Sequence, residues 1–66
     1  MNKLFEVAKE IIGLDENDAI SIIKESGGTY QIEERDGVLQ PIIEGFTEDR
    51  VTMKIKNELV IEAYIF

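Results

Sequence analysis

The sequence predicts a small α+β protein, and three of its features point to that class. Apolar residues recur at helical spacing twice before residue 27, and apolar and polar residues alternate over 29–34 and again after residue 50. A long irregular segment, residues 35–50, separates the two alternating regions. The chain has 66 residues and no cysteine, so we expect one domain, 1–66, held together by packing alone.

A first helix is expected between a candidate cap at Asn2 and a stop at Gly13. Its apolar side chains form one stripe: Leu4, Ala8 and Ile11, with Phe5 and Ile12 beside them. Such a stripe could receive a partner helix, but it packs into a core more often, and we expect the core.

A second helix has a stronger start signal. Asp15 is the expected N-cap, with Asp18 three residues later as in a capping box, and Gly27 and Gly28 supply a left-handed stop. The acidic run 15–18 lacks the glycine and the distant glutamate of a calcium loop, so capping is the better interpretation. The expected buried face consists of Ala19, Ile22 and Ile23.

Strands follow the helices. Residues 29–34 alternate as a half-buried strand does, and Asp36-Gly37 then predicts a turn. The alternation returns at Val51, and Asn57-Glu58 predicts the tight turn of a closing hairpin. The last strand, 59–66, has apolar residues on both faces, so either the first helix covers one face or a homodimer forms through this strand.

Four stretches resemble the potato type-I protease inhibitor superfamily, the fold of eglin and barley chymotrypsin inhibitor, and especially its small bacterial relatives. They are G-L-D-E-N-D-A-I-S-I-I-K (13–24), Y-Q-I-E-E-R-D-G (30–37), D-R-V-T-M-K-I-K-N (49–57) and V-I-E-A-Y-I (60–65). The similarity covers about residues 13–66 and lies in the order of elements, the loop length and the Asp49-Arg50 pair. The first helix, 1–12, lies outside it.

The resemblance implies a helix packed on a small mixed three-stranded sheet. The strand near Tyr30 would run parallel to the strand near Val51, with a long exposed inhibitory loop between them. In such inhibitors the loop lies in a protease cleft like a substrate and adds main-chain hydrogen bonds as an extra strand does. A rigid loop loses less conformational entropy on binding.

The resemblance also implies the residues of the site. The reactive loop would be Ile42, Ile43, Glu44, Gly45, Phe46, Thr47 and Glu48, braced by Asp49 and Arg50. Glu44 falls on the acyl side of the scissile bond and Gly45 on the leaving side. Relatives usually have a large apolar residue in place of Glu44 and a second bracing arginine in place of Thr52. Because an apolar pocket does not compensate the desolvation of a carboxylate, the expected target is a serine protease with a basic or Glu-accepting pocket.

The net charge of the chain restricts the class of partner that it can bind. The formal net charge is −7, and the segment from Glu33 to Arg50 holds six acids and two bases. This balance opposes binding to nucleic acid or to anionic membranes, which need clustered Lys and Arg, and favours a protein partner. The acids either keep the loop solvated or steer it toward a basic protein. Charged residues interrupt the first 13 residues, so we expect no signal peptide and a cytoplasmic protein.

Catalysis is not expected. The chain has no His and no Cys, and Ser21 and Ser26 fall in or at the end of the second predicted helix without a base. We expect no cofactor and no metal. Two alternatives to protease inhibition remain: a non-catalytic acidic interaction module on the same scaffold, such as a phage or host regulatory inhibitor of a cytosolic protein, and an acidic mimic of DNA.

Overall fold

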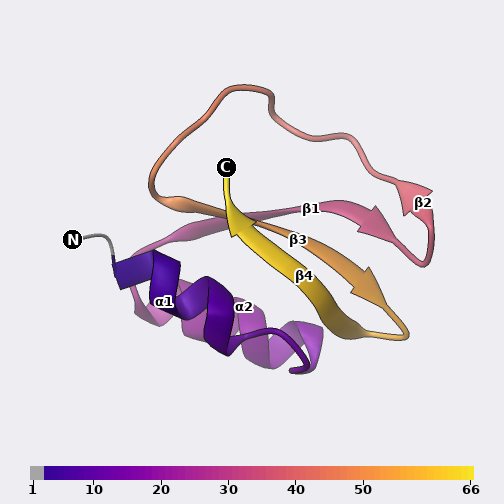
Figure 1. Ribbon diagram of the computed structural model, residues 1–66, viewed down its shortest axis with the longest axis horizontal. Helices are drawn as coiled ribbons and strands as arrows, with labels where there is room; N and C mark the ends of the chain where they lie inside the picture. Colours follow the sequence, from indigo (N-terminus) through magenta and orange to yellow (C-terminus); the bar gives the residue numbers. More distant parts are fainter. Residues whose placement is uncertain (1–2) are drawn as a thin grey trace.

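The computed structural model describes residues 3–66 and contains two helices and a four-stranded sheet (Figure 1). The elements are α1 (Lys3–Glu10), α2 (Glu16–Glu25), β1 (Thr29–Arg35), β2 (Val38–Leu39), β3 (Arg50–Lys56) and β4 (Leu59–Ile65). The predicted α+β class is confirmed. The candidate cap Asn2 lies outside the described residues.

The strands lie in the order β2-β1-β3-β4, with a parallel pair, β1 and β3, at the centre and antiparallel neighbours at both edges. The sheet therefore has one strand more than the three that the resemblance implied. The extra strand arises because Asp36 and Gly37 have φ values of 51° and 82°. A two-residue turn with positive φ at both positions closes a hairpin, so Val38 and Leu39 pair with the end of β1.

Both helices pack on one face of the sheet, and the core lies between the two layers (Figure 1). The buried apolar side chains are Leu4, Val7, Ala8, Ile11, Ala19, Ile23, Val51, Met53, Ile55, Val60 and Ile65. The first helix thus belongs to the same core as the rest of the chain. The prediction that its whole stripe is buried was wrong for Phe5 and Ile12, which are exposed. Phe5 lies about 100° around α1 from the buried Leu4, and Ile12 lies in the turn after α1.

The predicted ends of α2 are confirmed. A carboxylate oxygen of Asp15 accepts a hydrogen bond from the main-chain N of Asn17 at 2.9 Å. After the last turn, Gly27 has a φ of 81°, and the N–H of Gly28 donates to the carbonyl of Ile23 at 3.0 Å. This is the Schellman pattern, in which a glycine accepts the left-handed conformation without steric cost.

The last strand departs from simple alternation. Val60 and Ile65 are five residues apart and both are buried, although strict alternation predicted opposite faces. The register of β4 against β3 skips Ile61, which forms a bulge, and a bulge reverses the facing of the residues beyond it. The connection between the helices covers the start of this edge, where Gly13 and Leu14 exchange main-chain hydrogen bonds with Val60.

No helix within residues 3–66 has the length and apolar character needed to cross a membrane.

Candidate binding loop

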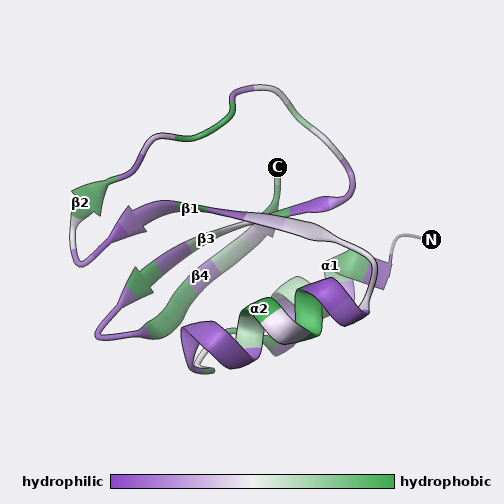
Figure 2. Ribbon diagram, turned by 180° about the vertical axis from the view of Figure 1, so that it is seen from behind, coloured by the Kyte–Doolittle hydropathy of each residue, from purple (hydrophilic) through white to green (hydrophobic). Residues whose placement is uncertain are grey.

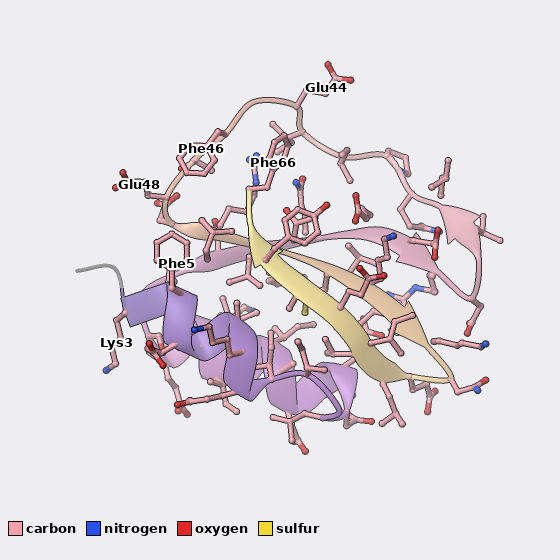
Figure 3. The ribbon with its side chains drawn as sticks, viewed as in Figure 1. Lys3, Phe5, Glu44, Phe46, Glu48 and Phe66 are labelled. Carbon is pink, nitrogen blue, oxygen red and sulfur yellow. The ribbon has the colours of Figure 1, made fainter. Side chains whose placement is uncertain are left out.

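Residues 40–49 connect β2 to β3 and arch away from the sheet (Figure 1). The loop carries apolar residues although it is exposed to solvent (Figure 2). The side chains of Ile43 and Phe46 are 68% and 62% exposed. Glu44 lies at the top of the arch and points away from the rest of the molecule (Figure 3). The segment predicted as the reactive loop therefore presents the side chains of Ile43, Glu44 and Phe46 outward.

Arg50 braces the loop from beneath. It opens β3, is 8% exposed, and lies on the sheet face opposite the helices, because the next residue, Val51, is buried in the core. Its Nη2 atom donates to the carbonyl oxygens of Ile43 at 3.2 Å, Gly45 at 2.6 Å and Phe66 at 2.9 Å. One guanidinium nitrogen thus joins two points of the loop to the end of the last strand. Within residues 3–66, its buried Nε has no hydrogen-bond partner.

A second brace comes from Gln31 on β1. Its Oε1 accepts a hydrogen bond from the main-chain N of Ile43 at 2.9 Å, and its Nε2 donates to Oγ1 of Thr52 at 3.0 Å. Thr52 occupies the position where the resemblance implied a second arginine. Here its hydroxyl orients the side-chain amide of Gln31, which in turn bonds to the loop. The sequence analysis assigned Gln31 no part in the site. The only feature of the sequence that could have indicated this role is that Gln31 is a polar residue on the non-core face of β1, where it is paired with Thr52 in the parallel register.

The end of the loop is fixed through Thr47 and Asp49. The main-chain N of Thr47 donates to the carbonyl of Phe66 at 3.1 Å, and the Thr47 hydroxyl donates to a carboxylate oxygen of Asp49 at 2.6 Å. The carbonyl of Asp49 accepts the main-chain N of Thr29 at 2.7 Å. Asp49 therefore ties the loop to the start of β1 by its main chain and to Thr47 by its side chain.

These bonds leave a pattern of period two along the loop. Main-chain groups of Ile43, Gly45 and Thr47 are bonded toward the sheet. Those of Ile42, Glu44 and Phe46 have no hydrogen-bond partner within residues 3–66. In an extended chain, alternate main-chain groups point in opposite directions. Ile42 and Glu44, which precede the turn at Gly45, therefore hold unpaired donors and acceptors on the outer side of the loop, as the unpaired edge of a sheet does, and the main-chain groups of Phe46 beyond the turn are unpaired within residues 3–66 as well.

Gly45 has a φ of 102°, a value that residues with a Cβ atom seldom adopt. A Cβ at this position would meet no atom within 4 Å, so space is not the constraint. The glycine is required by the direction in which the chain turns immediately after Glu44.

Aromatic rings border the end of the loop on the same sheet face. The rings of Tyr64 and Phe66 are 6.4 Å apart between centroids and tilted by 58°. Burial and a hydrogen bond to Glu33 raise the pKa of Tyr64 to about 12, and the negative charges of Glu33 and Glu62 act in the same direction. Tyr64 is therefore a neutral phenol at physiological pH.

The arrangement suits recognition by a protruding surface. Within residues 3–66 the molecule has no pocket and no group of three acidic side chains that could hold a metal ion. The site residues of the sequence analysis form one exposed arch, with Arg50 beneath it. No protein-family model, no curated protein and no solved structure matches the chain.

Proposed function

We propose that the protein inhibits a serine protease by laying residues 42–48 in the protease cleft as an added strand. The observation that carries this proposal is the alternation of main-chain hydrogen bonds along the loop. The inward-facing groups are already bonded to the sheet, and the outward-facing groups of Ile42, Glu44 and Phe46 are the ones that an added strand uses.

The bracing supports slow cleavage of the loop. Ile43 precedes Glu44 and Gly45 follows it, and the carbonyls of both bond to the same nitrogen of Arg50. Hydrolysis of the Glu44–Gly45 bond would leave each new end held by its own contact, so the ends would stay close enough to rejoin. The same contacts lower the conformational entropy that the loop loses on binding.

Glu44 sets the class of protease. Its carboxylate is at the top of the arch, with its side chain exposed, so it would enter the specificity pocket of the enzyme. A carboxylate that leaves water for an apolar pocket loses its hydration without return, whereas a basic pocket replaces that hydration with an ion pair. The favoured target is therefore a glutamate-specific serine protease.

A small enzyme panel tests the proposal. We expect the wild-type protein to inhibit a glutamyl endopeptidase at submicromolar concentration and subtilisin far less. Glu44→Leu should reverse this preference, and Glu10→Gln, an exposed acid on α1, is the matched control and should leave it unchanged. Absence of inhibition of the glutamyl endopeptidase by the wild-type protein at micromolar concentration would contradict the proposal.

A further inference from the structure

The aromatic residues of this protein lie outside its core. The chain has three phenylalanines, and Phe5, Phe46 and Phe66 are 52%, 62% and 36% exposed. The fully buried side chains are aliphatic residues, Met53 and Thr52. Exposed Phe rings leave a large apolar area in water, and such rings are enriched in protein interfaces. The exposure of these rings therefore favours contact with a binding partner.

The three rings belong to one region of the surface. The main-chain N of Thr47, the residue after Phe46, bonds to the carbonyl of Phe66. At Asp49 the loop returns to the sheet, next to Gly28. A Cβ placed on Gly28 would lie 2.7 Å from the Leu4 side chain and 3.3 Å from the carbonyl of Asp49, so Gly28 lies between the two. The first turn of α1 therefore lies beside the end of the loop. Figure 3 shows Phe5 and Phe46 toward this end of the molecule and Phe66 beneath the arch.

The size of a stable complex requires contacts beyond the loop. A specific interface buries about 800 Å² on each partner and involves about 20–30 residues a side. The loop, residues 42–48, has seven residues, which is fewer than that number. Phe66, the neighbouring Tyr64 and Phe5 are exposed aromatic groups near the end of the loop that follows the proposed scissile bond.

We propose that Phe5, Phe46 and Phe66 form a second contact surface, the aromatic surface, for the protease that receives Glu44. This inference rests on the proposed function. The partner would be a serine protease with a basic pocket for Glu44 and an apolar surface on the side of its cleft that holds the residues after Glu44. Through Phe5, the helix outside the inhibitor resemblance would contribute directly to target binding.

Charge complementarity supports the same partner. Phe46 lies two residues after Glu44 and two residues before Glu48, and both acids are exposed. An apolar ring near the exposed carboxylate of Glu44 fits an apolar groove bordered by basic side chains. It fits a second copy of this chain poorly, because two copies would bring like charges together.

The inhibition constant for a glutamyl endopeptidase tests the inference with a matched control. Phe5→Ala and Phe66→Ala should each weaken inhibition about tenfold, mainly by faster dissociation. Phe5→Tyr, which keeps a ring, should inhibit as the wild type does. Ile12→Ala is the control, because Ile12 is apolar, is 49% exposed and lies in the turn after α1, at the opposite end of the helix from Phe5.

The outcomes separate the two proposals. If the wild type inhibits, and the inhibition constants of Phe5→Ala and Ile12→Ala are both within about twofold of the wild-type value, the aromatic surface is overturned. The loop mechanism would still stand. Equal weakening by Phe5→Ala and Ile12→Ala would also overturn it, since the effect would not be local. Absence of inhibition by the wild type would overturn both proposals. Thermal unfolding of each variant should show that these exposed substitutions leave the fold intact.

Discussion

The Nη2 atom of Arg50 lies 2.6 Å from the carbonyl oxygen of Gly45, so the first residue of β3 holds the loop immediately beyond Glu44. The same atom reaches Ile43 before Glu44. A charged donor buried under the arch is worth more than a neutral one, because hydrogen bonds to charged groups contribute about 1.5–3 kcal/mol. Rigidity of the loop therefore depends on Arg50 more than on any residue within the arch.

Replacement of Arg50 should release the loop. We expect Arg50→Ala to lower the free energy of unfolding by about 2 kcal/mol and to speed cleavage of residues 42–48 by subtilisin at least tenfold. The stability and cleavage rate of Arg50→Lys should lie between those of the wild type and Arg50→Ala, because an ammonium lacks the planar fork of the guanidinium. Mass spectrometry of the cleaved chain gives the site and rate. Lys56→Ala, at the other end of β3, is the control, and an unchanged rate for Arg50→Ala would contradict the bracing.

Gln31 and Thr52 should act as a unit. Gln31→Ala frees the main-chain N of Ile43, and Thr52→Val removes the acceptor that orients the Gln31 amide. A double-mutant cycle by urea unfolding should give a coupling free energy of about 0.5–1.5 kcal/mol. Additive effects of the two substitutions would show that Thr52 does not hold Gln31 in solution.

The positive φ at Gly45 should tolerate a D residue but not an L residue. Gly45→Ala places an L residue at a φ of 102°, at a cost of about 1–3 kcal/mol to the braced loop. We expect weaker inhibition of the glutamyl endopeptidase by about tenfold or more. Replacement of Gly45 with D-alanine in a synthetic chain should inhibit as the wild type does, because a D residue favours positive φ. Equal inhibition by both chains would contradict the positive φ.

Acid should weaken the link between α2 and β1. Arg35 donates to both carboxylate oxygens of Glu16, at 2.5 and 2.8 Å, and this hydrogen bonding holds the pKa of Glu16 below its ordinary value of 4.5. A depressed carboxyl pKa stabilises the folded state above the unfolded pKa, and this stability is lost as pH falls through the folded pKa. Because Arg35 is partly exposed, the contribution is about 0.5–1 kcal/mol.

Thermal unfolding between pH 7 and pH 3 measures this effect. The wild-type melting temperature should fall more steeply below about pH 4.5 than that of Glu16→Gln, which is less stable at pH 7. Glu10→Gln removes one negative charge without touching this pair and should follow the wild-type slope. Parallel curves for the wild type and Glu16→Gln would contradict the assignment.

Local signals in the sequence predicted much of the fold. Asp15, the glycine pair after α2 and the Asn57-Glu58 turn each specify a conformation within a few residues, and the structure confirms all three. The strand β2 was missed because a pairing of two residues has no periodicity to detect. The bulge at Ile61 was missed because it depends on the register between strands.

Long-range contacts limited the prediction of the site. The resemblance proposed a loop braced by Arg50, but the role of Gln31 depends on Thr52, which is 21 residues away in the chain. The exposure of Phe5 depends on which face of α1 meets β4, and helical spacing alone gives a stripe without its exact edges. Both features follow from packing between elements rather than from any single segment.

Amide hydrogen exchange tests the central claim most directly, residue by residue along the loop. In the free protein, the amides of Ile43 and Thr47 should exchange slowly, and those of Glu44 and Phe46 should exchange nearly as fast as in an unfolded chain. On addition of a glutamyl endopeptidase inactivated at its catalytic serine, Glu44 and Phe46 should become protected while Ile43 and Thr47 change little. Fast exchange at Ile43 and Thr47 in the free protein, or no protection of Glu44 and Phe46 with the enzyme, would contradict the account.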